Sequence, residues 1–172
     1  MPDAKSIHEL NADLFHPEEV DRFEDPREAR KKAMDYLARR EYGQEELISK
    51  LATAGFHADI AADVVGVLRD ENLQSDQRFA ESFVQSRISQ GKGPVRIRQE
   101  LKERGIRSEL ISDALQEAGE DWFALALEIR VRKFGSDIPG DFTEKARQMR
   151  FLQYRGFEQE HIQCAVRTDG AS

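Results

Sequence analysis

The chain has 172 residues, of which 39% are hydrophobic and 34% charged, and 26 Lys and Arg against 33 Asp and Glu give it a formal net charge of −7. This composition predicts one or two soluble domains and argues against a membrane-spanning or secreted chain, because no apolar run approaches the roughly 20 residues that cross a bilayer and the first residues contain no signal-peptide pattern. The single cysteine, Cys164, cannot form a disulfide within the chain, so we expect a cytoplasmic protein.

Residues 1–24 differ in composition from the rest of the chain. They carry seven acidic side chains, against which stand only Lys5 and Arg22. Such a density of like charge is typical of a solvated segment, so we expect an acidic N-terminal arm outside the folded core. An arm that covers a basic surface of the same chain is the alternative interpretation.

After the arm, the sequence predicts an all-α protein. Residues that favour helix dominate, and no stretch alternates apolar and polar side chains as a half-buried strand would. The run Asp25-Pro26-Arg27-Glu28 combines a capping residue, a proline at the first helical position and a capping-box glutamate, so a helix should begin near Pro26. Glycines close or separate roughly nine short helical runs, and we expect left-handed backbone at them. They are Gly43, Gly55, Gly91, Gly105, Gly119, Gly135 and Gly156.

Three of these glycines belong to an internal repeat of about 50 residues. Gly55, Gly105 and Gly156 each follow a leucine by four positions, precede an apolar residue and separate two helical runs. A further helix is predicted before each pair, over residues 26–40, 76–90 and 121–134. Each repeat should therefore form a three-helix bundle.

The repeat suggests a domain organisation. We place the arm at 1–24 and the three-helix units at 25–74, 75–119 and 120–172. A unit of about 48 residues is near the lower limit for an independent core, so the units should pack on one another in an elongated, curved array. Such an array exposes a long face that suits an extended partner, and nothing in the sequence requires a dimer, so we expect a monomer.

Positive charge is concentrated in the second unit. Residues 78–107 contain eight Lys and Arg against three acidic residues, although the chain as a whole is acidic. A local basic surface of this kind is typical of proteins with anionic or acidic partners. The candidate binding residues are Arg87, Lys92, Arg96, Arg98, Lys102 and Arg104, with Arg39 and Lys133 as weaker extensions.

The helix predicted from Pro94 has two unequal basic sides. Glu100 stands four residues from both Arg96 and Arg104 and should neutralise them. Arg98 and Lys102 have no acidic residue three or four positions away. The pair is therefore either solvated or compensated by an anionic partner or by a carboxylate from elsewhere in the fold.

The turn Gly91-Lys92-Gly93-Pro94 could place glycine backbone and a lysine near phosphate oxygens, or it could simply separate two helices. It does not match a nucleotide-binding P-loop, which needs Lys followed by Ser or Thr after a strand. The turn thus indicates a non-specific phosphate contact or a helix break.

The sequence contains no recognisable catalytic or metal-binding pattern. None of the four histidines has a second ligand in an HExxH- or CxxC-type pattern, and Cys164 is expected to be a small core residue. We therefore predict a non-enzymatic protein without metal or cofactor.

Residues 78–106, RFAESFVQSRISQGKGPVRIRQELKERGI, closely resemble the hallmark of the RecX family of bacterial regulators of the RecA recombinase. The resemblance extends to residues 33–56, 132–135 and 150–157. Gly43, Val95 and the length of the acidic arm depart from the family pattern outside the central motif.

The resemblance implies tandem three-helix repeats in a curved array. It also implies binding within the groove of the RecA filament on DNA, which typically inhibits ATP hydrolysis, strand exchange and co-protease activity and so regulates homologous recombination, DNA repair and the SOS response. Two other functions stay open from the residues alone: a helical module that binds DNA directly and competes with other DNA-binding proteins, and a structural adaptor for another protein.

Overall fold

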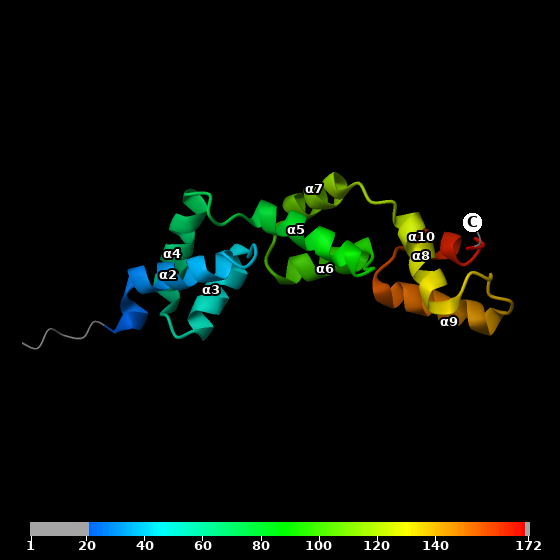
Figure 1. Cartoon of the computed structure of the whole chain (residues 1–172), viewed down its shortest axis with the longest axis horizontal. Helices are drawn as coiled ribbons and strands as arrows, with labels where there is room; N and C mark the ends of the chain where they lie inside the picture. The colour runs from blue at the N-terminus through cyan, green and yellow to red at the C-terminus, as the bar shows by residue number, and fades with distance from the viewer. Residues whose placement is uncertain (1–20, 171–172) are drawn as a thin grey trace, which may run out of the picture.

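The computed structural model describes residues 21–170 and arranges them as a row of three helical units that curves along its length (Figure 1). Within this range there are nine α-helices, a 3-10 turn at Arg22–Glu24 and no strand. The predicted all-α fold with three tandem three-helix units is confirmed. No helix in the described part of the chain is long and apolar enough to cross a bilayer.

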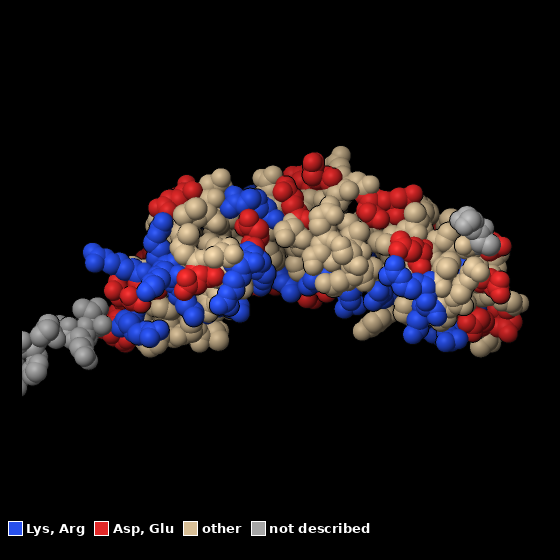
Figure 2. All heavy atoms as spheres, in the orientation of Figure 1, with Lys and Arg blue, Asp and Glu red and all other residues tan. Residues whose placement is uncertain are grey.

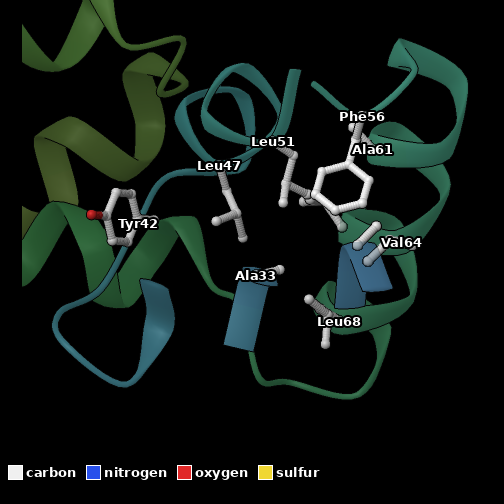
Figure 3. Packing of buried hydrophobic residues seen from close by; sticks show 10 residues of the cluster. Ala33, Tyr42, Leu47, Leu51, Phe56, Ala61, Val64 and Leu68 are labelled. Carbon is white, nitrogen blue, oxygen red and sulfur yellow. The ribbon is translucent and has the colours of Figure 1, made fainter. Parts of the chain in front are cut away.

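The first unit consists of α2 (Pro26–Leu37), α3 (Gln44–Thr53) and α4 (Ala58–Asp70). As predicted, α2 begins at Pro26, and the carboxylate of Asp25 accepts the N–H of Arg27 at 2.9 Å. Side chains from all three helices converge in one core, with Tyr42 at its margin (Figure 3). The fully buried residues of this core include Ala29, Ala33, Leu47, Leu51, Ala61, Val65 and Leu68.

The second unit consists of α5 (Asp76–Ser89), α6 (Pro94–Glu103) and α7 (Ser108–Ala118). Pro94 again occupies the first turn of its helix. Ile97 and Leu101 of α6 are fully buried and pack with the apolar stripe of α5. That stripe contains Phe79, Ala80, Phe83 and Val84.

The third unit consists of α8 (Trp122–Phe134), α9 (Phe142–Arg155) and α10 (Gln159–Ala165). Asp141 caps α9, since its carboxylate accepts the N–H of Glu144 at 2.7 Å. Ile88 and Trp122 pack against the cores of both the second and the third units. The two cores are therefore linked by shared apolar contacts.

Arg130 is a fully buried cation within the third unit. Its guanidinium donates to the backbone carbonyls of Asp137 at 2.9 Å and Thr168 at 3.0 Å, and to the side-chain oxygen of Gln148 at 3.3 Å. Burial lowers the pKa of Arg130, and the charge of Asp169 opposes that effect. This one side chain holds the end of the described chain against the loop after α8.

Two local predictions were wrong. Gly43 does not close a helix with left-handed backbone. It has φ −66° and caps the start of α3, packing against Ile106 and Phe79 of the second unit. Cys164 is exposed rather than part of the core. The other six predicted glycines have positive φ, as expected.

Most of the predicted acidic arm, residues 1–20, lies outside the described residues. Its last part forms the turn Arg22–Glu24, whose Phe23 packs against the first unit. The rings of Phe23 and Phe56 meet edge to face with centroids 5.4 Å apart, and Phe23 also covers Gly55.

The junction between the first and second units is polar. The buried Gln74 amide donates to the backbone carbonyl of Tyr42 at 3.1 Å and to the carboxylate of Asp76 at 3.0 Å. Asp76 also accepts the N–H of Gln44 at 2.8 Å. These hydrogen bonds join the loop before α3 to the start of α5, and an ion pair of 3.0 Å between Arg78 and Glu41 adds to them.

The junction between the second and third units includes hydrogen bonds between main-chain atoms. Gly93 donates its N–H to the carbonyl of Arg155 at 2.8 Å, and Val95 donates to the carbonyl of Gly156 at 2.9 Å. The two chains approach so closely that a Cβ at position 93 would overlap the carbonyl of Gly156. Only glycine permits this contact, so the glycine that precedes Pro94 fixes how the third unit docks.

Candidate partner-binding surface

The curvature separates charges of opposite sign. On the face shown in Figure 2, Lys and Arg gather along the concave edge, whereas Asp and Glu are prominent on the convex edge above α7. Helix α6, on the concave side, carries Arg96, Arg98 and Lys102, and α7, on the convex side, carries Glu109 and Asp113. The acidic chain therefore presents a basic inner edge.

Glu100 lies among the cations of this edge. Its carboxylate accepts from Arg87 Nε at 2.9 Å and from Arg96 Nε at 3.4 Å. Burial by itself would raise the pKa of Glu100, but the hydrogen bonds and charges of Arg87 and Arg96 outweigh burial and lower it. The predicted pairing of Glu100 with Arg96 is confirmed, and Arg87 is an additional partner from α5.

The predicted neutralisation of Arg104 by the Glu100 carboxylate is wrong. Arg104 instead donates to the backbone carbonyl of Glu100 at 3.3 Å, and its guanidinium lies 4.8 Å from the ring centroid of Phe83. Arg87 contacts the same ring at 4.1 Å. The two Glu100 oxygens pair with Arg87 and Arg96, and Arg104 forms no ion pair with a carboxylate in residues 21–170.

The structure distinguishes between the two members of the Arg98/Lys102 pair. Arg98 forms an exposed ion pair of 3.3 Å with Glu158, which precedes α10 in the third unit. A carboxylate distant in sequence therefore compensates Arg98. Lys102 is exposed, and its side chain has no ion pair or hydrogen bond within residues 21–170.

The backbone of the Gly91-Lys92-Gly93-Pro94 turn cannot bind phosphate as the glycines suggested. The N–H of Lys92 donates to Arg87, and those of Gly93 and Val95 donate to the third unit. Pro94 has no N–H to offer. The turn therefore separates two helices and contacts the third unit. Of the groups in the turn, the Lys92 side chain is the one available to bind an anion.

Lys92 lies in a cationic environment. Partial burial and the nearby charges of Arg96 and Arg155 lower its pKa, and Glu100 opposes them. We define the junction cluster as Arg87, Lys92, Arg96 and Arg155 with Glu100. In this cluster four cations lie near one carboxylate, so the local electrostatic potential is positive and attracts anions.

Sequence reasoning missed Arg155, which belongs to this cluster, and Tyr154, which lies beside it. Arg155 donates to the carbonyl of Gln90 at 2.9 Å, and Tyr154 is 75% exposed next to Arg96. The repeat could have indicated Arg155, because it directly precedes Gly156 as Arg104 precedes Gly105. No signal in the sequence placed Tyr154 beside α6.

The two weaker candidates lie on other units. Arg39 follows α2 and is exposed, and its side chain makes no hydrogen bond, ion pair or ring contact with the described residues. Lys133, near the end of α8, is exposed and lies 5.9 Å from the ring centroid of Phe151. Neither residue contacts the junction cluster.

Two histidines fall in the described range. His161 is buried, and its Nδ1 accepts the N–H of Glu158 at 3.2 Å, so it caps α10. His57 lies 3.8 Å from Glu24 and close to Asp21, but all three side chains are exposed. This group lies at the surface of the first unit, and exposed acidic groups of this kind commonly bind no metal ion.

Models of the three RecX three-helix domains match the chain in order. The first domain matches residues 29–68, the second 75–115 and the third 119–166. The regulatory protein RecX of Halorhodospira halophila is 43% identical over 134 residues, which cover 78% of this chain and 83% of that protein. The regulatory protein RecX of Chromohalobacter salexigens is 45% identical over 135 residues, which cover 78% and 88% of the two chains. The chain belongs to the RecX family.

Two solved RecX structures share the fold. RecX from Lactobacillus salivarius superposes with a TM-score of 0.68 at 21% identity, covering 83% of this chain and 94% of that one. A crystal structure described as regulatory protein RecX gives a TM-score of 0.70 at 22% identity, covering 96% and 78%. The RecX resemblance predicted from residues 78–106 is confirmed.

Proposed function

We propose that this RecX-family protein is a non-enzymatic regulator that binds the RecA nucleoprotein filament. In this role it modulates, typically by inhibition, the filament's ATPase, strand exchange and co-protease activities and so acts in homologous recombination, DNA repair and SOS control. We further propose that it acts in the cytoplasm as a monomer. The observation that supports this function best is the curved row of units with a basic concave edge on an otherwise acidic chain.

The shape suits a helical polymer with bound DNA. A filament groove is long and curved, and a row of three units can follow it over several subunits, whereas a compact domain contacts only a few. Basic side chains on the inner edge attract the phosphates of the DNA and the acidic patches of the filament. The candidate residues of the second unit are Arg87, Lys92, Arg96, Arg98, Lys102 and Arg104, with Arg39 and Lys133 as extensions on the neighbouring units.

The test is the single-stranded-DNA-dependent ATPase of RecA, measured with and without this protein at two salt concentrations. Binding of the protein to the same DNA without RecA is measured in parallel. We expect suppression of the ATPase at protein concentrations too low to occupy bare DNA. Suppression only where bare DNA is already covered would contradict filament regulation.

The second candidate function is direct binding of DNA in competition with other proteins. It is favoured by the junction cluster, in which four cations share one carboxylate. Direct binding predicts tight association with free DNA and a steep dependence on salt. Filament regulation predicts weak association with free DNA and strong association with the filament.

A further inference from the structure

The junction cluster lies beside an exposed aromatic ring. Tyr154, on the last turn of α9, is 75% exposed. The guanidinium of Arg96 lies 5.4 Å from its ring centroid and donates to its backbone carbonyl at 3.4 Å. Arg96 thus positions the tyrosine, while most of the ring surface stays open to solvent.

The cations next to Tyr154 have few partners of their own. Arg96 shares Glu100 with Arg87. Arg155 donates to a backbone carbonyl, and Lys92 forms no ion pair with any carboxylate in residues 21–170. An external anion placed here would relieve the repulsion among these side chains.

We propose that Tyr154, Lys92 and Arg96 form a subsite for one nucleotide of a single DNA strand, with the base stacked on Tyr154 and the phosphate beside Lys92 and Arg96. A nucleotide carries both an anion and a flat aromatic surface, which matches an exposed ring that adjoins Lys92 and Arg96, a cation that shares its one carboxylate with Arg87. An acidic peptide would satisfy the cations but would leave the ring uncovered. A paired duplex would present phosphates but no free base face.

This inference rests on the proposed function, because it assigns the junction between the second and third units to the DNA strand of the filament. It adds Tyr154, an aromatic residue from the third unit, to a surface that the charge pattern located mainly in the second unit. The lowered pKa of Lys92 supports it, since burial and the nearby charges of Arg96 and Arg155 outweigh the opposing charge of Glu100.

The test is fluorescence anisotropy of labelled oligothymidine with the full chain at low ionic strength. Tyr154→Leu should weaken binding roughly 10- to 100-fold, because a base stacked on an aromatic side chain is worth about 1–3 kcal/mol. Tyr154→Phe should bind within about twofold of the wild type, since the ring is kept. Lys92→Gln should lower the slope of log affinity against log salt by about 0.7.

The matched control is Phe142→Leu, because Phe142 is an 85% exposed aromatic at the opposite end of the same helix. It should leave oligothymidine binding unchanged. The effect of Tyr154→Leu should also be absent with a duplex of equal length. Circular dichroism should show the same helicity for every variant, because both aromatic residues are exposed.

Each failure has a distinct signature. Wild-type affinity of Tyr154→Leu for oligothymidine would overturn the subsite, and the proposed function would survive if that variant still suppressed the RecA ATPase. Polyglutamate is the probe for an acidic protein surface. If it binds in a way that depends on Lys92 but not on Tyr154, and oligothymidine does not bind, the ligand of this site is an acidic protein surface and the DNA subsite is overturned. If the wild-type protein bound oligothymidine in a way that depends on Tyr154 but did not suppress the RecA ATPase, the proposed function would be overturned and the subsite would stand.

Discussion

The guanidinium of Arg96 in the second unit lies over the ring of Tyr154 in the third, 5.4 Å from its centroid. The same side chain donates to the backbone carbonyl of Tyr154. A residue of the candidate binding surface therefore also contacts the neighbouring unit. Charge on the concave edge and docking of the third unit are physically linked at this point.

Charge reversal on α6 should separate binding from folding. Arg98→Glu combined with Lys102→Glu should weaken filament binding roughly tenfold, because two exposed cations of α6 become anions. The fold should persist, since the ion pair of Arg98 with Glu158 is exposed and worth at most about 1 kcal/mol. Affinity is measured from titration of RecA ATPase suppression and helicity by circular dichroism.

The control for this reversal carries the same change in charge on other helices. Arg69→Glu with Arg132→Glu alters two exposed residues on α4 and α8 that pair only with neighbours in their own segments. It should leave affinity nearly unchanged. If both double variants weakened filament binding equally, Arg98 and Lys102 would act only through the net charge of the protein and not as part of the binding surface.

Glu100 should make stability depend on pH in acid. Its folded-state pKa is lowered because Arg87 and Arg96 outweigh the effect of burial, so the unfolded chain takes up the proton at a higher pH than the folded chain. The stabilisation is fully present above the unfolded-state pKa of about 4.3 and is lost as the pH falls through the lower folded-state value. Urea unfolding should therefore show a smaller acid-induced loss of unfolding free energy in Glu100→Gln than in the wild type.

The control is Glu128→Gln, because Glu128 is exposed and pairs with Arg132 on its own helix. This variant should lose stability in acid as the wild type does. Equal acid-induced losses in the wild type and in Glu100→Gln would show that the Glu100 ion pairs do not contribute to folding.

The glycine contact at the second junction should tolerate no side chain. Gly93→Ala places a Cβ against the carbonyl of Gly156, so the third unit must shift. We expect a loss of about 1–3 kcal/mol of unfolding free energy. Thermal unfolding measures this loss, and small-angle X-ray scattering should show a changed overall shape. Gly140→Ala, where an added Cβ has no neighbour within 4 Å, should change neither measurement.

Arg130 should be irreplaceable even by another cation. Arg130→Lys keeps the charge, but it loses the planar fork that reaches the carbonyls of Asp137 and Thr168 together. Buried acceptors left without donors cost about 1–3 kcal/mol, so thermal unfolding should occur at lower temperature. Arg132→Lys on the same helix alters an exposed residue and should stay within about 0.5 kcal/mol of the wild type. Similar effects of the two substitutions would contradict a special role for Arg130.

Two truncations should differ in stability. Removal of residues 1–24 deletes Phe23, whose ring packs on Phe56 and covers Gly55, and should cost about 1–3 kcal/mol. Removal of residues 1–20 should leave the unfolding free energy unchanged, and both truncations should keep the helicity and affect filament affinity modestly. Urea unfolding followed by circular dichroism compares the two chains. An equal loss in both would mean that Phe23 contributes little.

Local features of the fold were predictable from the sequence. The start of α2 at Pro26 and the burial of Ile97 and Leu101 follow from capping residues and helical spacing, which act over a few positions. The 50-residue repeat indicated three units because similar local patterns give similar bundles. These predictions need no knowledge of how the units pack on one another.

The candidate site was only partly predictable, because its main contacts join different units. Glu158 compensates Arg98 from 60 positions away, and Tyr154 meets Arg96 from 58 positions away. The carbonyls of the third unit also accept hydrogen bonds from the N–H groups of Gly93 and Val95, so these groups are not free to bind phosphate. Each contact depends on docking geometry, which spacing along one helix does not contain.

The main-chain contact between Gly93 and the 155–156 segment has an evolutionary consequence. Two hydrogen bonds between backbone groups set the approach of the third unit, and they involve no side-chain atom. Exposed residues of α6 and α9 that make no contact across the junction can therefore be exchanged without altering this main-chain contact. Within a lineage that keeps these glycines, shape can be inherited unchanged while the charge pattern on the inner edge diverges to match a changing partner.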